Sequence, residues 1–169
     1  AQMRALLDLS GSVFERSDDS SGNLGDVFRQ AAADLGRLWA TVPDRDPAAL
    51  AAEVLATMDA DGYGVTDRLL AAAGSALGAQ GRAELRRLLQ ARLAGLPRQA
   101  DDKGGLNSHG RRETASRLAE LADLEEDVDA YIEAMDQGGM TQSHAAEIAE
   151  RLLAHGRGEA ALDWLDRNG

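Results

Sequence analysis

One stretch in the first half of the chain has the residue types of a calcium-binding loop. Residues 59–64 read Asp-Ala-Asp-Gly-Tyr-Gly. A calcium loop needs acidic or amide side chains at positions 1, 3 and 5, a glycine at position 6 and a glutamate at position 12. Here position 5 is Tyr63 and position 12 is Leu70. Because the strongest ligand is missing, the stretch predicts a turn in which Gly62 or Gly64 has a positive φ angle, and no metal ion.

The three histidines, His109, His144 and His155, do not have the spacing of metal ligands. His144 and His155 are eleven residues apart, which is about 16 Å along a helix and too far to share one ion. His155 directly precedes Gly156, so we expect it to interact with the C-terminal carbonyls of its own helix.

Motifs for nucleophilic or nucleotide chemistry are missing from the chain. It has no G-x-S-x-G elbow, no P-loop and no G-x-G-x-x-G fingerprint. It also has no cysteine, which excludes a thiol nucleophile, a thiolate zinc site and a disulfide framework. None of the 29 acidic residues is singled out by an apolar setting. We therefore expect no enzyme activity, no catalytic residues, no cofactor and no metal.

The aromatic residues are the best candidates for contacts with a partner, because aromatic side chains dominate interface energetics. Trp164, Tyr63 and Trp39 are the candidate contacts. Trp39 and Tyr131 continue apolar stripes, for which core packing is the favoured alternative. Trp164 lies near the end of the chain, where the next hairpin of a helical stack would dock.

The composition predicts an all-α protein with a protein or peptide partner. Alanine, leucine, arginine and the acids dominate, and only 4% of the residues are aromatic. The net charge of −11 argues against binding to nucleic acid. No run of roughly 18 apolar residues could span a bilayer, so we expect no membrane insertion and a cytoplasmic location.

The charge is unevenly distributed along the chain. Residues 80–117 carry 9 basic and 4 acidic residues, a balance of +5, whereas residues 118–169 carry 3 basic and 13 acidic residues, a balance of −10. Solvated helix faces explain this pattern best. The alternative is that the acidic part steers a basic partner.

Apolar residues at helical spacing predict five helices before residue 95. A first helix near 3–14 is interrupted at Ser10-Gly11, and Ser and Asn oxygens of residues 18–23 can cap the second helix. Asp46 caps the third helix, with Pro47 at its first position. Thr66 can cap the fourth helix, and Gly78 and Gly81 mark the turn that follows it. The widest apolar stripe, on the second helix, consists of Leu24, Val27, Phe28, Ala31, Leu35, Leu38, Trp39 and Val42.

The chain is expected to form helical residues 1–94, a linker loop at 95–110 and helical hairpins over 111–169, with one continuous domain as the alternative. The linker is rich in glycine, proline and polar residues. The last part pairs helices 114–124 and 126–135, and then two helices within 148–165 that join at Gly156.

The two hairpins of this last part are related by a period of about 30 residues. Leu118-Ala119-Glu120 aligns with Ile148-Ala149-Glu150, and this period is close to that of helical-hairpin solenoids. The alanines and the Gly-Arg turn of the last hairpin resemble a tetratricopeptide-type repeat. We expect antiparallel hairpins stacked as a short α-solenoid or an irregular bundle.

The whole chain resembles an uncharacterised bacterial family of helical-repeat proteins, whose repeats are similar to those flanking SWIM-type zinc fingers. The segments that carry the resemblance are 14–22, 61–65, 127–131 and 148–165. The resemblance implies an α-solenoid-like fold and no assigned activity. Because the cysteine and histidine ligands of a SWIM finger are absent, it implies neither zinc nor DNA binding.

These observations favour a non-enzymatic interaction module that binds a protein or peptide through its helical stack. One alternative is a small-ligand or enzymatic pocket between the helical groups. The other is a segment that forms homo-oligomers through the C-terminal hairpin, which ends near Trp164.

Overall fold

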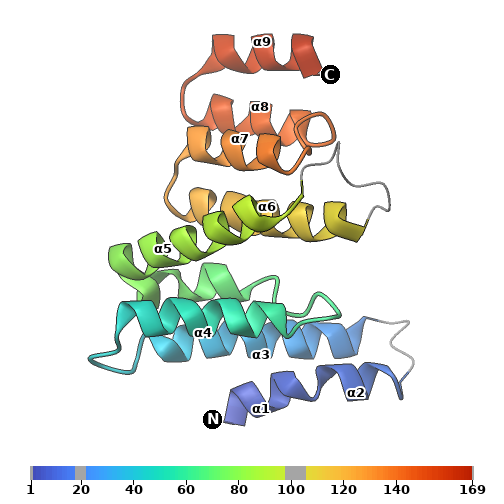
Figure 1. Cartoon of the computed structure of the whole chain (residues 1–169), viewed down its shortest axis with the longest axis vertical. Coiled ribbons are helices and arrows are strands. Elements are labelled where there is room, and N and C mark those ends of the chain that lie inside the picture. Colours follow the sequence, from blue (N-terminus) through green and yellow to red (C-terminus); the bar gives the residue numbers. More distant parts are fainter. Residues whose placement is uncertain (1, 18–21, 98–105, 169) are drawn as a thin grey trace. The chain divides into compact units, whose positions relative to one another are not determined.

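The computed structural model describes residues 2–17, 22–97 and 106–168, and the side chains of residues 106–108 are not included. Within these residues all regular structure is helical, in nine helices. The all-α prediction is therefore confirmed. The chain divides into two compact units, residues 1–85 and 86–169, with the boundary inside the fifth helix (Figure 1).

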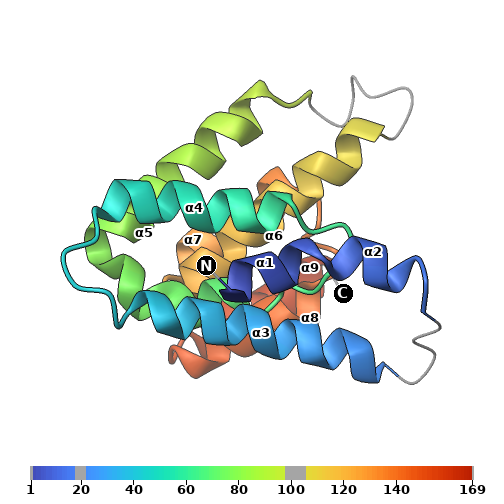
Figure 2. The same cartoon turned by 90° about the horizontal axis from the view of Figure 1, so that it is seen from below.

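The first unit contains α1 (Gln2–Asp8), α2 (Ser10–Phe14), α3 (Asn23–Trp39), α4 (Pro47–Asp59) and the first part of α5 (Leu69–Gly95). Helix α1 packs beside α3, as Figure 2 shows from below. The predicted start of α4 is confirmed, since the Asp46 side chain accepts a hydrogen bond from the amide of Ala48 at 3.0 Å. The break between α1 and α2 lies at Leu9, one residue before the predicted position.

The predicted break at Gly78 is also confirmed. This residue has φ 56° and ψ −172°, which are not helical angles, and it kinks α5. Gly81, in contrast, lies inside the second part of the helix, where an added Cβ would meet Leu77 side-chain atoms at 3.1 Å. Only one of the two glycines is therefore a turn residue, because a break with these backbone angles needs just one residue without a Cβ.

Gly22 is the N-cap residue of α3. The predicted capping by residues 18–23 falls mostly on residues 18–21, which lie outside the described residues. The predicted apolar stripe of α3 is wrong in part, because Val27, Leu38 and Val42 are exposed. The buried face instead includes the small residues Gly25, Ala32, Ala33 and Gly36. At Gly36 an added Cβ would lie 2.8 Å from the Cβ of Ala72 in α5, so this residue lets α5 approach α3 closely.

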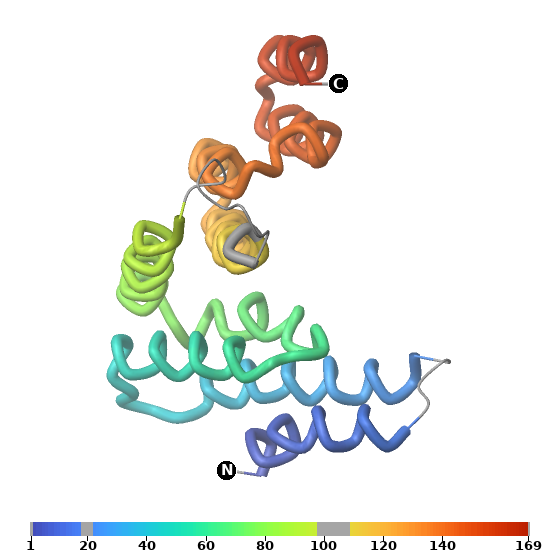
Figure 3. Tube along the Cα trace, turned by 45° about the vertical axis from the view of Figure 1, so that its right-hand side comes forward, coloured from blue at the N-terminus to red at the C-terminus, as the bar shows by residue number. Residues whose placement is uncertain are grey.

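The second unit contains the rest of α5, followed by α6 (Leu106–Leu124), α7 (Val128–Gln137), α8 (Ala145–Ala154) and α9 (Gly158–Asn168). Since α6 begins at Leu106, the last five residues of the predicted linker are helical, and residues 98–105 lie outside the described ranges. Helices α6 and α7 form one hairpin and α8 and α9 another, and α7 packs against α8. Figure 3 shows these four helices in chain order.

The turns of the two hairpins have the same hydrogen bonds, thirty residues apart. The amide of Asp127 donates to the carbonyl five residues earlier at 3.0 Å, and the amide of Arg157 does the same at 2.8 Å. The residue before each donor has a positive φ angle, which is 55° at Glu126 and 72° at Gly156. This is the Schellman arrangement, which ends a helix by satisfying its last carbonyls. Because both helices end in the same way, the 30-residue alignment of the sequence holds for the backbone of the turns.

Candidate functional site

The calcium-like stretch at residues 59–64 forms a turn between α4 and α5. One carboxylate oxygen of Asp61 accepts from the amide of Tyr63 at 2.9 Å, and the other accepts from the amide and hydroxyl of Thr66 at 2.7 and 2.8 Å. Gly64 has φ 69°, which confirms the predicted positive φ angle. Thr66 thus donates to Asp61, and no side-chain cap of α5 is seen at this position. The carboxylate of Asp61 is used to hold its own loop.

Among residues 2–17, 22–97 and 106–168, no three metal-ligating side chains are placed so that they could hold an ion. Nδ1 of His155 lies 2.9 Å from the carbonyl oxygen of Arg151, so the predicted contact with the end of its helix is confirmed. Nδ1 of His144 lies 3.1 Å from the carbonyl oxygen of Met140. Both of these imidazoles therefore contact backbone carbonyls near helix ends.

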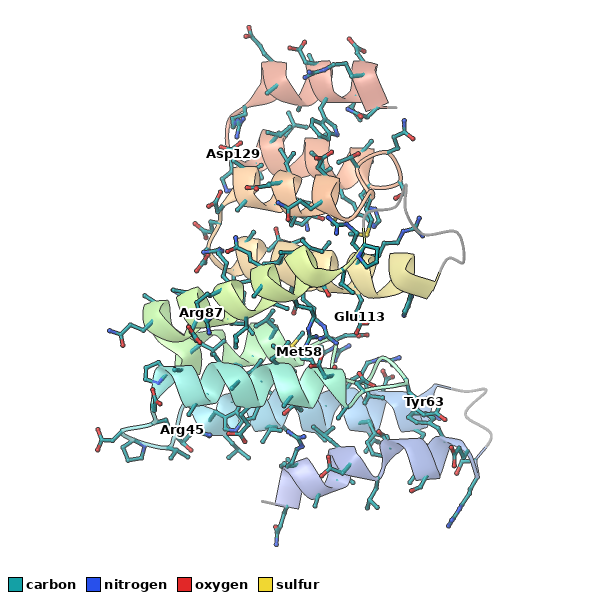
Figure 4. All side chains as sticks on the ribbon, in the orientation of Figure 1. Arg45, Met58, Tyr63, Arg87, Glu113 and Asp129 are labelled. Carbon is teal, nitrogen blue, oxygen red and sulfur yellow. The ribbon has the colours of Figure 1, made fainter. Side chains whose placement is uncertain are left out.

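The three candidate partner contacts have different surroundings. Trp39 is buried, so it is a core side chain, as the alternative interpretation of its stripe predicts, and it is not a surface anchor. Tyr63 is 47% exposed, but one face of its ring stacks on Phe14 with the ring centroids 5.0 Å apart (Figure 4). Trp164 is half-buried on α9. Its Nε1 atom is buried and has no hydrogen-bond partner within the described part of the chain.

Helix α8 is attached to α6 and α7 by charged side chains. Nε and Nη2 of Arg151 each donate to a carboxylate oxygen of Asp123 at 2.7 Å, and the guanidinium lies 3.9 Å from the ring centroid of Tyr131. The hydrogen bonds to Asp123 raise the pKa of Arg151, and burial raises the pKa of Tyr131. In the turn after α8, Arg157 donates to Asp129 at 2.7 Å. These contacts set the register of α8 on the first hairpin.

The second hairpin, in contrast, exposes three leucines. Leu162 is 66% exposed, Leu153 is 57% exposed and Leu165 is 39% exposed. Residues 158, 162 and 165 follow helical spacing along one face of α9. Cδ2 of Leu153 lies 3.9 Å from the position of an added Cβ on Gly158, which places Leu153 beside the start of this face. We call Leu153, Leu162 and Leu165 the terminal surface.

Exposed carboxylates surround the terminal surface. Glu159 and Asp166 are three residues before and four residues after Leu162, so they share its face of α9. Glu150 is likewise one turn before Leu153 on α8. The terminal surface is therefore apolar at its centre and acidic at its rim.

The 30-residue alignment compares these exposed positions with the first hairpin, against which α8 packs. Shifting by 30 residues pairs Leu153, Glu159, Leu162 and Leu165 with Asp123, Asp129, Ile132 and Met135, respectively. Asp123 and Asp129 are the residues that bind Arg151 and Arg157, and Met135 is only 5% exposed. Leu153 and Glu159 thus occupy the positions at which α8 and its following turn bind the first hairpin, and Leu165 aligns with a buried residue of α7.

Sequence reasoning placed the candidate contact at Trp164 and did not identify the leucines as exposed. Leu162 and Leu165 keep helical spacing with Ala161, a pattern that favours burial. The structure shows that Ala161 is the buried residue of α9. The signal that could have identified the leucines is the 30-residue period, because it aligns Leu153 with Asp123, which binds Arg151 of α8, and Leu165 with the buried Met135.

A concave feature lies in the first unit. A groove of about 610 Å³ between α1 and α3 is lined by Met3, Leu6, Val27 and Ala31, with Asp26, Gln30, Asp34 and Arg68 also at its walls. Asp34 accepts hydrogen bonds from Arg37 and Gln30, and the bond from Arg37 is the main reason for its lowered pKa. Asp26 is paired with Arg29. The acidic groups of this groove are thus already engaged within α3.

The comparisons with known proteins place the chain in a family. A family of unknown function, DUF6880, matches residues 2–169. The chain belongs to this family. No curated protein and no solved structure gives a significant match to the chain. The part of the expected resemblance that concerns an uncharacterised family is therefore confirmed.

Within the described ranges, no helix combines the length and the apolar character that crossing a membrane requires.

Proposed function

We propose that this DUF6880 chain is a non-enzymatic interaction module that binds a protein partner through the terminal surface. The observation that carries the proposal is that Leu153, Leu162 and Leu165 are exposed on one hairpin. They align with Asp123, which binds Arg151 of α8, and with Ile132 and Met135 of α7, which packs against α8. Single exposed leucines are common on protein surfaces, but apolar residues grouped inside a polar rim are typical of interaction sites.

We also propose that α6–α7 and α8–α9 are two copies of a helical repeat similar to tetratricopeptide hairpins. The matching hydrogen bonds at Asp127 and Arg157 support this interpretation, as do the positive φ angles that precede them. In a repeat array each unit covers a face of its neighbour, and the exposed terminal surface is a face of this kind on the second hairpin.

A protein partner fits the charge of the chain better than a nucleic acid does. The net charge is −11, and residues 118–169 carry 13 acidic and 3 basic residues, which opposes binding to phosphates. A cytoplasmic location in bacteria is part of the same proposal, and it fits a chain without cysteine.

Affinity capture with a matched pair of variants tests the proposal. The variant L162E/L165E places two charges on the terminal surface, while L38E places one on a leucine of the first unit that is 48% exposed, between Leu165 and Leu162. We expect specific partners to be captured by the wild type and by L38E and to be lost from L162E/L165E, with circular dichroism unchanged in all three. Capture of the same proteins by L162E/L165E would contradict the proposal.

A further inference from the structure

We infer that the terminal surface binds an amphipathic helix that runs antiparallel to α9 and carries a basic residue just beyond its C-terminal end. This inference rests on the proposed interaction function and names the partner's chemistry. It is argued from the way in which α8 lies on α7, since the terminal surface is aligned with the α8-binding positions of the first hairpin.

The direction of the helix follows from the first hairpin. Arg157 comes after the end of α8 and binds Asp129, which lies in the first turn of α7 (Figure 4 labels Asp129). The C-terminal end of α8 therefore lies at the N-terminal end of α7. Glu159 is the residue of α9 that is aligned with Asp129, and it is exposed. A helix that docks in the same way brings its C-terminal end to Glu159, where a cation is favoured by the carboxylate and by the negative C-terminal dipole of the docking helix itself.

The apolar face of the helix follows from the leucines. In the first hairpin, Asp123 binds Arg151 of α8. The aligned residue in the second hairpin is Leu153, so the docking helix needs an apolar residue where α8 has Arg151. Ile148, one turn earlier on α8, is fully buried. The partner helix is therefore apolar at the positions of Ile148, Arg151 and Leu152 and basic at the position of Arg157.

The charge of the rim argues against a second copy bound face to face. In a two-fold symmetric contact through α9, the same surface meets itself. Glu159, Asp163 and Asp166 would then meet the same acidic face of the other copy, and like charges across an interface are unfavourable. A helix with a basic end avoids this repulsion, which is why we assign it as the occupant.

A peptide derived from α8 tests the inference. The probe is a fluorescein-labelled peptide of residues 141–157 with R151L, so that leucine faces Leu153 and the final arginine faces Glu159. Fluorescence anisotropy with the full chain is expected to show saturable binding. The chain variant L162E/L165E is expected to abolish it, while L38E leaves it unchanged. The same peptide with Arg151 retained is expected to bind about tenfold more weakly, because a charged group would meet an apolar one.

A charge exchange tests the direction of the helix. The chain variant E159K is expected to weaken the probe about fivefold, because partly exposed ion pairs contribute modestly. Replacing the final arginine of the probe by glutamate is expected to restore the affinity for E159K and to weaken binding to the wild type. If the probe that ends in glutamate does not regain affinity for E159K, the antiparallel arrangement is overturned.

Failure of this inference can be distinguished from failure of the proposed function. If the probe does not bind but partner capture is still lost from L162E/L165E, the chain is an interaction module and the α8-like helix is the wrong occupant. If sedimentation shows concentration-dependent dimers that L162E/L165E dissociates and the probe does not bind, the occupant is a second copy and the inference is overturned.

Discussion

The two hairpins of the second unit end their first helices in the same way but differ in what lies on their second helices. Glu126 and Gly156 both have positive φ angles, and the same hydrogen bonds follow them. Helix α7, however, lies against α8, and its Val128 and Met135 are buried. On α9 the aligned face carries the exposed Leu162 and Leu165. A local sequence pattern therefore reproduces a turn, whereas the environment of a helix face depends on its neighbours.

The largest effect is expected from Gly138, which allows the close approach of α6 and α7. A Cβ added there would lie 2.7 Å from the Cβ of Ala115 and 2.7 Å from Cε of Met140. We expect G138A to destabilise the second unit by about 2 kcal/mol through overpacking. The measurement is urea unfolding followed by the fluorescence of Trp164 in a W39F background.

The matched control for this prediction is G158A in the second hairpin. There the nearest side-chain atom to an added Cβ is Cδ2 of Leu153 at 3.9 Å, so we expect no loss of stability. Equal destabilisation by the two alanines would show that the first hairpin is not packed more closely than the second at these positions.

A smaller effect is expected from removing the cation that attaches α8. R151M loses two hydrogen bonds to Asp123 and the contact with Tyr131. The free energy of unfolding is expected to fall by about 1.5 kcal/mol, because charged hydrogen bonds are strong but this pair is partly exposed to solvent. Denaturant unfolding of R151M, D123A and the double variant measures the coupling. Simple additivity of the two single changes would mean that the pair does not hold α8.

Arg157 provides the comparison for this prediction. Its partner Asp129 is largely exposed, so R157M is expected to cost less than about 0.5 kcal/mol. A loss as large as that of R151M would show that the turn after α8, rather than α8 itself, carries the attachment to the first hairpin.

The two turns give opposite predictions for glycine. Glu126 has φ 55°, an angle that costs energy for a residue with a Cβ. We therefore expect E126G to stabilise the chain by about 0.5 kcal/mol. This is less than the energy cost of the positive φ angle, because glycine also has more conformational freedom in the unfolded state. G156A introduces the same strain at φ 72° and is expected to destabilise by about 1 kcal/mol. Thermal unfolding of both variants measures these shifts, and shifts of the same sign would contradict the prediction.

The smallest effect concerns alkaline pH. Burial raises the pKa of Tyr131 above its ordinary value of 10.0, so the folded chain holds this proton more tightly than the unfolded chain does. The stability due to the neutral phenol is complete below pH 10 and is lost as the pH rises from there through the folded pKa. We expect the stability of Y131F to fall less over this range than that of the wild type, because phenylalanine has no proton to lose. Unfolding of the wild type and Y131F at a series of alkaline pH values measures the difference, and identical slopes would contradict it.

Most helices and their ends could be predicted from local sequence. Asp46 and Pro47 mark the start of α4, Gly78 marks the kink in α5, and Gly156 marks the turn between α8 and α9. Each of these signals acts through the backbone of adjacent residues. The turn at Glu126 could not be recognised by its residue type, because glutamate rarely adopts a positive φ angle and does so here within the hydrogen bonds of a Schellman turn.

The candidate site could be predicted only in part. The C-terminal hairpin was identified as the end of a stack, but the sequence favoured Trp164 over the leucines beside it. Whether an apolar side chain in an amphipathic helix is buried depends on the width of the face that a neighbour covers. Val27 and Leu38 of α3 and Leu162 of α9 have helical spacing that suits burial, and all three are exposed.

The sequence by itself determined that the chain is all-α, where most of its helices begin and end, and that its last two hairpins are aligned at thirty residues. These properties depend on hydrogen bonds and dihedral angles between residues close in the chain. Only the tertiary structure decided that Trp39 is in the core, that Arg151 binds Asp123, and that Leu162 and Leu165 face solvent. Burial and ion pairing depend on which distant segments come together, and no local pattern specifies them.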